Sequence, residues 1–132
     1  MELQVGVKII LQNKEGKYLL LKRNPEKYPE TGAKWDIVGG RINIGSSLLE
    51  NLKREVFEET GLGINSDPKL IAAQDILKID KHVVRLTYTG FTEVEVKLSE
   101  EHSDFKWISR EDVKTLDPID SYTKSVFDTF LN

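Results

Sequence analysis

Cysteine, long apolar runs and a surplus of basic residues are all missing from this chain of 132 residues. Without cysteine the protein can form neither a disulfide nor a zinc–thiolate site, and it has no thiolate nucleophile. No apolar run approaches the roughly 18 residues of a membrane-spanning helix, and the amino terminus lacks the basic-then-apolar pattern of a secretory signal. We therefore expect a cytoplasmic protein with no membrane partner.

The balance of charge argues against a nucleic-acid partner. The chain has 19 Lys and Arg against 22 Asp and Glu, a net charge of −3, whereas nucleic-acid-binding surfaces usually cluster basic residues. No repeat and no Pro/Gly-rich linker divides the sequence, so we expect a single domain over residues 1–132. Association into a homodimer stays open at this point.

The apolar pattern predicts several strands. Alternating apolar residues at 3–11 are typical of a half-buried strand, and a turn at 13–16 joins it to a buried strand at 18–21 as a hairpin. Residues 24–34 contain prolines and a glycine and are expected to be a loop. Further strands are predicted at 35–38, 70–79, 83–91 and 104–108.

Helices are predicted between and after these strands. Ser47 and Glu50 have the spacing of a capping box, and Gly61 suits the left-handed conformation that follows a helix end. We expect the apolar face of this helix to comprise Leu48, Leu49, Leu52 and Val56. A short helix is predicted from 109, and a last helix is expected to pack through Tyr122, Val126 and Phe130. This order favours an α/β or α+β fold, a mixed sheet with helices on both faces.

Three glutamates share one face of the predicted helix at 47–61. Glu55, Glu58 and Glu59 fall within an arc of roughly 100° because residues three and four apart on a helix are neighbours. Like charges gathered in this way repel one another unless a positive group lies between them. A divalent cation that prefers oxygen ligands, Mg²⁺ or Mn²⁺, is the simplest such group. The alternative is a solvated acidic face, but the glutamates lie near the helix C-terminus, where the macrodipole disfavours acid.

The same stretch resembles the signature of the Nudix hydrolases, G-x5-E-x7-R-E-U-x-E-E-x-G-U, with U an apolar residue. The matching residues are Gly40, Arg54, Glu55, Val56, Glu58, Glu59, Gly61 and Leu62, which fill eight of the nine specified positions. Flanking residues 34–36 and 101–108 also look like family surroundings. The resemblance implies a Nudix-type α/β/α sandwich with a central mixed β-sheet, and it covers nearly the whole chain.

The resemblance also implies roles for individual residues. Glu58 and Glu59 would be metal ligands, and Glu55 would be a further ligand or the base that takes a proton from water. Gly39 would offer its carbonyl to the same metal, and Glu101 is a weaker candidate for a downstream ligand or base. Arg54 belongs to the catalytic signature. The expected cofactor is Mg²⁺ or Mn²⁺.

One position departs from the family pattern. Ser46 stands where the signature has its first glutamate, and Asn43 replaces another acid often seen in that loop. In the family this glutamate usually ties the loop to the helix. Because Glu50 precedes Arg54 by four residues, the favourable order for an acid–base pair on a helix, we expect Glu50 to take over this structural role.

The expected activity is hydrolysis of a diphosphate linkage in a nucleoside diphosphate derivative. A (deoxy)nucleoside triphosphate is favoured slightly over a nucleotide sugar as the small-molecule substrate. Arg23 and Lys22, at the end of the second strand, are candidates to bind phosphate, with a solvated strand end as an equal alternative. Trp35 is a candidate to stack on a base, but core or loop packing is the favoured interpretation of this residue. The alternative is a non-catalytic nucleotide-binding or regulatory domain, which Ser46 alone supports.

Overall fold

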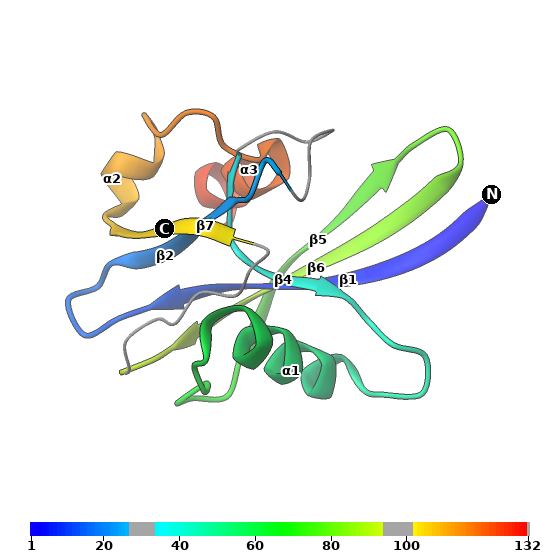
Figure 1. Ribbon diagram of the computed structural model, residues 1–132, viewed down its shortest axis with the longest axis horizontal. Coiled ribbons are helices and arrows are strands. Elements are labelled where there is room, and N and C mark those ends of the chain that lie inside the picture. The colour runs from blue at the N-terminus through cyan, green and yellow to red at the C-terminus, as the bar shows by residue number, and fades with distance from the viewer. Residues whose placement is uncertain (27–33, 94–101, 132) are drawn as a thin grey trace.

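The computed structural model describes residues 1–26, 34–93 and 102–131 of the chain (Figure 1). Three helices and a seven-stranded mixed sheet are formed in this part. The elements are β1 (Glu2–Gln12), β2 (Tyr18–Arg23), β3 (Trp35–Asp36), β4 (Val38–Arg41), α1 (Leu48–Thr60), β5 (Lys69–Leu77), β6 (Lys81–Phe91), β7 (His102–Ile108), α2 (Arg110–Val113) and α3 (Ser121–Thr129).

Strand β1 is the centre of the sheet. It pairs in parallel with β6 over its whole length and antiparallel with β2 and β4. Strands β3 and β7 extend the sheet beyond β2, and β5 extends it beyond β6. The sheet is therefore mixed, as the order of elements predicts.

Each face of the sheet carries its own apolar core. Val7, Ile9 and Leu11 of β1 pack in one core with Leu52 and Val56 of α1. The other core joins Ile10, Leu20 and Ile37 of the sheet to Val113 of α2 and to Val126 and Phe127 of α3. Figure 1 shows α1 on one side of the sheet and α2 and α3 on the other. The predicted fold, a mixed sheet with helices on both faces, is confirmed.

Burial on both faces corrects the prediction for the first strand. The pattern at 3–11 suggested that one face meets solvent, but Lys8 and Ile10 on the other face are also buried. They are covered because the C-terminal helices pack over the same stretch of β1 that α1 covers from the opposite side. Within the described ranges, no helix has the length and apolarity needed to cross a bilayer.

Helix α1 begins and ends as predicted. The Ser47 side chain accepts a hydrogen bond from the Glu50 amide, and Gly61 follows the helix with φ of 72° while its amide donates to the Phe57 carbonyl. The expected apolar face is only half right: Leu52 and Val56 are buried, but Leu48 and Leu49 are largely exposed. Leu48 and Leu49 lie in the first turn of the helix and belong to neither apolar core.

Helix α3 packs through a different face from the one expected. Val126 is buried as predicted, but its buried neighbours are Thr123 and Phe127, while Phe130 is largely exposed. Phe130 lies just beyond the last residue of the helix, where the period of four no longer applies.

Candidate active site

A cavity of about 410 Å³ opens where the C-terminal half of α1 meets β1, β4 and the end of β2. Its described lining is strongly polar and contains no aromatic side chain. The lining residues are Gln4, Lys8, Arg23, Asp36, Gly39, Gly40, Arg41, Glu55, Glu58, Glu59 and Lys81. We call the acidic side chains that α1 contributes the acidic wall, and the cations that the strands contribute, Lys8, Arg23, Arg41 and Lys81, the basic wall.

The acidic wall consists of the three glutamates that the sequence places on one helix face. Glu59 is 3% exposed, and both of its carboxylate oxygens accept the Gly39 amide proton, with N···O distances of 3.3 Å. The side chain of Glu55 is 14% exposed and that of Glu58 is 57% exposed. The structure thus brings together one buried and two accessible carboxylates at the same cavity.

The two glycines at the start of the signature are required for different reasons. Gly39 has φ of 146°, and a Cβ there would lie 2.0 Å from the Val7 carbonyl oxygen on the paired strand. Gly40 has no such strain, but a Cβ there would lie 2.6 Å from a carboxylate oxygen of Glu55. Gly39 therefore allows β4 to pair with β1, while Gly40 leaves space for the Glu55 carboxylate.

Arg54 lies beside the acidic wall and neutralises part of it. Its guanidinium is 3.3 Å from Glu55 and 3.9 Å from Glu58. It also donates hydrogen bonds to the Arg41 carbonyl and to Asn51 Oδ1. Arg54 forms no ion pair with Glu50, and both residues belong to the described part of the chain. The hypothesis that Glu50 orients Arg54 is therefore wrong.

Asn51 performs the task that was expected of Glu50. Its Oδ1 accepts from Arg54 at 2.8 Å and from the Asn43 amide at 2.8 Å, while its Nδ2 donates to the carbonyls of Ser46 and Ser47. One buried amide therefore ties the loop to the helix without a carboxylate at position 46. Sequence reasoning missed Asn51, although its place three residues before Arg54 was a usable signal.

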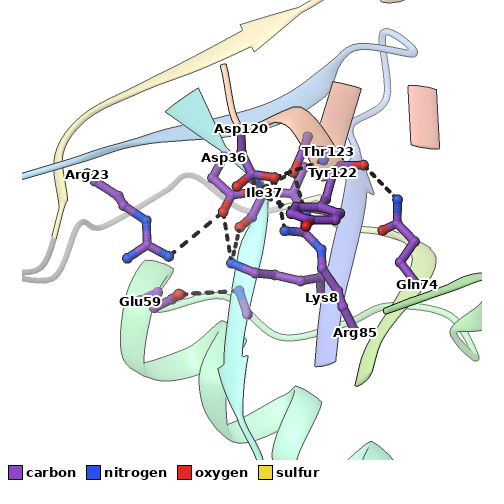
Figure 2. A network of polar contacts seen from close by, with 11 residues as sticks. Lys8, Arg23, Asp36, Ile37, Glu59, Gln74, Arg85, Asp120, Tyr122 and Thr123 are labelled. Atoms are coloured by element: carbon purple, nitrogen blue, oxygen red, sulfur yellow. Dashed lines mark hydrogen bonds and ion pairs between the residues drawn. The ribbon is translucent and has the colours of Figure 1, made fainter. Parts of the chain in front are cut away.

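Asp36 is the buried anion beneath the basic wall (Figure 2). Its Oδ2 accepts from Lys8 at 3.2 Å and lies 3.9 Å from Arg23, and Arg85 approaches Oδ1 at 3.3 Å. Thr123 Oγ1 donates to the same Oδ1. Burial alone would raise the pKa of Asp36, but Lys8, Arg85, the Thr123 hydroxyl and Arg23 together hold its pKa well below the usual range.

Arg85 joins this network to α3. It bonds Asp36 and Thr123 through one terminal nitrogen and Asp120, the N-cap residue of α3, through the other at 3.1 Å. Lys8 also donates to the Ile37 carbonyl at 3.2 Å. The network was not predicted, because its members lie on β1, β3, β6 and α3 and only the tertiary fold brings them together.

The substrate-binding candidates are divided by the structure. Arg23 lines the cavity, as expected. Lys22 instead lies over the ring of Trp35, with 5.9 Å between Nζ and the ring centroid, and is absent from the cavity lining. Trp35 is 5% exposed and belongs to the core beneath α2 and α3, so its assignment as a substrate contact is corrected. Glu101 lies outside the described residues.

The donor chemistry of the acidic wall fits a hard divalent cation. Three carboxylates face one cavity, and within the described lining neither histidine nor cysteine competes with them. As the side chains are placed, no three His, Cys, Asp or Glu of the described residues are grouped to hold a metal ion. Glu55 and Glu58 pair with Arg54, and Glu59 accepts from the Gly39 amide. A cation would therefore have to draw Glu55 and Glu58 away from Arg54.

The chain is similar to known proteins over nearly its whole length. Residues 2–130 match the family described as NUDIX domain. Nucleoside triphosphatase NudI of Escherichia coli O17:K52:H18 is 29% identical over 115 residues, which cover 79% of this chain and 80% of that protein. The solved structure of the MutT protein from Methanosarcina mazei Go1 is 30% identical, with a TM-score of 0.88 over 98% of this chain and 93% of that chain. The MutT NUDIX hydrolase from Burkholderia pseudomallei, 21% identical, shares the fold with a TM-score of 0.81 over 97% of this chain and 98% of that one.

Proposed function

The chain belongs to the NUDIX domain family, and we propose that it uses Mg²⁺ or Mn²⁺ to hydrolyse a diphosphate linkage in a nucleoside diphosphate derivative. A (deoxy)nucleoside triphosphate is the favoured substrate. The names of the similar proteins support this choice, since NudI of Escherichia coli is a nucleoside triphosphatase. The proposal also follows from the cavity itself, because a shared fold does not determine a reaction.

The opposition of the two walls carries the proposal. A diphosphate bridge is negatively charged, so the acidic wall repels it unless a cation lies between them, whereas the basic wall attracts it directly. A substrate that binds as a complex with a divalent cation interacts favourably with both walls, because its cation contacts the acidic wall and its phosphate oxygens contact the basic wall. The polar lining, with no aromatic side chain among its described residues, fits the phosphate chain rather than a base.

The acidic wall and the basic wall would have different roles in this reaction. Glu58, Glu59 and the Gly39 carbonyl would hold the metal, which when bound neutralises phosphate charge and lowers the pKa of a coordinated water. Arg54 pairs with Glu55 and Glu58, and metal binding would have to displace this pairing.

On the opposite side, Lys8 and Arg23 are held at the cavity by Asp36. They would bind phosphate oxygens and so orient the bridge toward the acidic wall. Glu55, the less exposed of the two carboxylates that pair with Arg54, would accept the proton of the attacking water.

A substrate panel tests the activity. The purified chain is incubated with Mg²⁺ or Mn²⁺ and with nucleoside triphosphates, their oxidised forms, nucleotide sugars and dinucleotides, and each product is identified. We expect a nucleoside monophosphate together with pyrophosphate or a phosphorylated remainder. If no nucleotide yields a phosphate-containing product with either metal, the proposed hydrolase activity is refuted.

A matched pair of variants tests the site. Glu58→Gln removes a carboxylate of the acidic wall, and Glu50→Gln removes the same charge from an exposed position of the same helix outside the cavity. Groups that only support a metal ligand already contribute about 10–100-fold to affinity or activity, so losing a ligand should cost at least about 100-fold. Glu50→Gln should behave as the wild type. Equal activities of the two variants would exclude Glu58 as a ligand.

The panel also decides the alternative, a non-catalytic nucleotide-binding domain. Only Ser46 favours it, and Asn51 already holds the Ser46 carbonyl and the loop. Nucleotide binding without turnover, unchanged by Ser46→Glu, is the result that would establish this alternative.

A further inference from the structure

The basic wall contains two cations that the network around Asp36 does not neutralise. Lys8 and Arg23 lie within 3.9 Å of Asp36. Arg41, the last residue of β4, and Lys81, the first residue of β6, form no ion pair in the part of the chain that the structure describes. Both line the cavity, so they are available to an anion that enters it.

Arg41 is exposed, but a side-chain hydrogen bond orients its guanidinium. Its Nε donates to Gln4 Oε1 at 2.9 Å, and its guanidinium lies over Gly6 of β1, where a Cβ would come within 3.2 Å of Nη1. Gly6 thus provides the recess and Gln4 the orientation. Gln4 accepts only from Nε, so the Nη hydrogens of Arg41 have no hydrogen-bond acceptor among the described residues. An arginine held in this manner presents a planar fork that suits phosphate oxygens.

The surrounding charges favour an anion at this position. Gly6 is the register partner of both Arg41 on β4 and Arg85 on β6, so the two arginines flank one glycine on the same face of the sheet. Burial, then Arg23 and Arg85, lower the pKa of Arg41. Arg85 has Asp36 and Asp120 as partners, whereas Arg41 has no carboxylate among the described residues. A bound anion would relieve this repulsion.

We propose that Arg41, oriented by Gln4 over Gly6, and Lys81 form a subsite for the free terminal phosphate of a linear triphosphate. The inference rests on the proposed function and narrows its substrate class. A terminal phosphate carries roughly −1.5 to −2 charges near neutral pH, whereas the sugar of a nucleotide sugar carries none. The subsite therefore selects nucleoside triphosphates over nucleotide sugars.

Calorimetry with inorganic triphosphate and Mg²⁺ measures binding at this subsite without a contribution from a nucleotide base. Arg41→Gln and Lys81→Gln should each weaken binding by about 10–100-fold, the usual value of a hydrogen bond to a charged group. Arg41→Lys should lose less, because it keeps the charge. Lys17→Gln, at an exposed position outside the cavity lining, is the matched control and should bind as the wild type. Unchanged binding in both glutamine variants overturns the subsite, as does a wild-type protein that does not bind triphosphate.

Steady-state kinetics supply the second measurement. Arg41→Gln should lower kcat/KM for a nucleoside triphosphate by about 10–100-fold and should lower kcat/KM for a nucleotide sugar of the same base by a clearly smaller factor. An equal loss on both substrates overturns the selectivity. Triphosphate binding that depends on Arg41 in a protein without turnover would leave the subsite standing and refute the proposed hydrolase. Rapid hydrolysis of a nucleoside triphosphate at the same rate in the wild type and in Arg41→Gln would support the proposed hydrolase and refute the subsite.

Discussion

Replacing Asp36 with asparagine removes one negative charge from beneath the basic wall and leaves the shape of the side chain unchanged. In the wild type this carboxylate faces two buried cations, Lys8 and Arg85, and a partly exposed one, Arg23. After the substitution Arg85 keeps Asp120 at 3.1 Å, but Lys8 keeps only the carbonyl of Ile37. Lys8 is therefore the group left buried without a counter-charge.

The magnitude follows from that asymmetry. Breaking one buried pair by removing a partner costs about 3–5 kcal/mol, because the remaining charge is left without compensation. Only Lys8 loses its sole anionic partner. We therefore expect the free energy of unfolding to fall by an amount within that range, and not by the sum of three broken ion pairs. For a domain of this size the melting temperature should fall by roughly 10–20 °C.

Urea unfolding at neutral pH measures the effect, with an unchanged m-value as the check that the transition remains two-state. Asp67→Asn, at an exposed position, is the matched control and should change the free energy of unfolding by less than about 0.5 kcal/mol. Adding Lys8→Met to Asp36→Asn should recover much of the loss, because it removes the uncompensated charge. A loss below about 1 kcal/mol for Asp36→Asn would show that the buried carboxylate does not neutralise Lys8.

The same network makes a prediction about pH. The folded pKa of Asp36 is depressed, so its contribution is fully present above the unfolded pKa of about 3.9 and is lost as the pH falls toward the folded pKa. The difference in unfolding free energy between the wild type and Asp36→Asn should therefore be constant above about pH 5 and shrink below about pH 4. A difference that grows as the pH falls would contradict the depressed pKa.

Three further predictions concern the acidic wall and the loop before α1. Gly40→Ala places a Cβ against the carboxylate of Glu55 and forces its flexible end aside. We expect kcat to fall by about 100-fold and the melting temperature to change little. A wild-type kcat would contradict this prediction. Asn51→Ala removes the hydrogen bonds that hold Arg54 and the loop and should cost about 1–3 kcal/mol in urea unfolding, and a neutral result would refute its role as the tie. Removal of divalent metal with a chelator should abolish hydrolysis, and added Mg²⁺ or Mn²⁺ should restore it; activity that persists in the chelator would refute the metal requirement.

Local features of the fold were predictable because their causes lie within a few residues of one another. The N-cap at Ser47 and the left-handed Gly61 define α1 through contacts with their own helix. The packing faces were less predictable, because burial depends on what lies opposite. Leu48 and Phe130 have the right spacing but extend beyond the core, whereas Lys8, a polar residue in an apolar pattern, is buried beside Asp36.

The candidate site was also predictable only where its features depend on residues that are close in the sequence. The spacing of Glu55, Glu58 and Glu59 follows from the period of a helix, so the amino-acid sequence alone determines that these carboxylates share a face. Their surroundings do not follow from any local rule. The Gly39 amide reaches Glu59 across 20 residues, and Arg85 reaches Asp36 across 49.

The sequence by itself therefore determined most of the elements, the two ends of α1 and the shared face of its three glutamates, because backbone geometry and helix periodicity act over one or two turns. It did not determine the ends of the strands: the single strand predicted at 35–38 is divided into β3 and β4. Only the tertiary structure decided that Trp35 belongs to the core, that Asn51 rather than Glu50 supports Arg54, and that a basic wall faces the glutamates. Those outcomes depend on strand order and on which buried charges find partners. The free energy of burying a charge is set by neighbours that are distant along the chain.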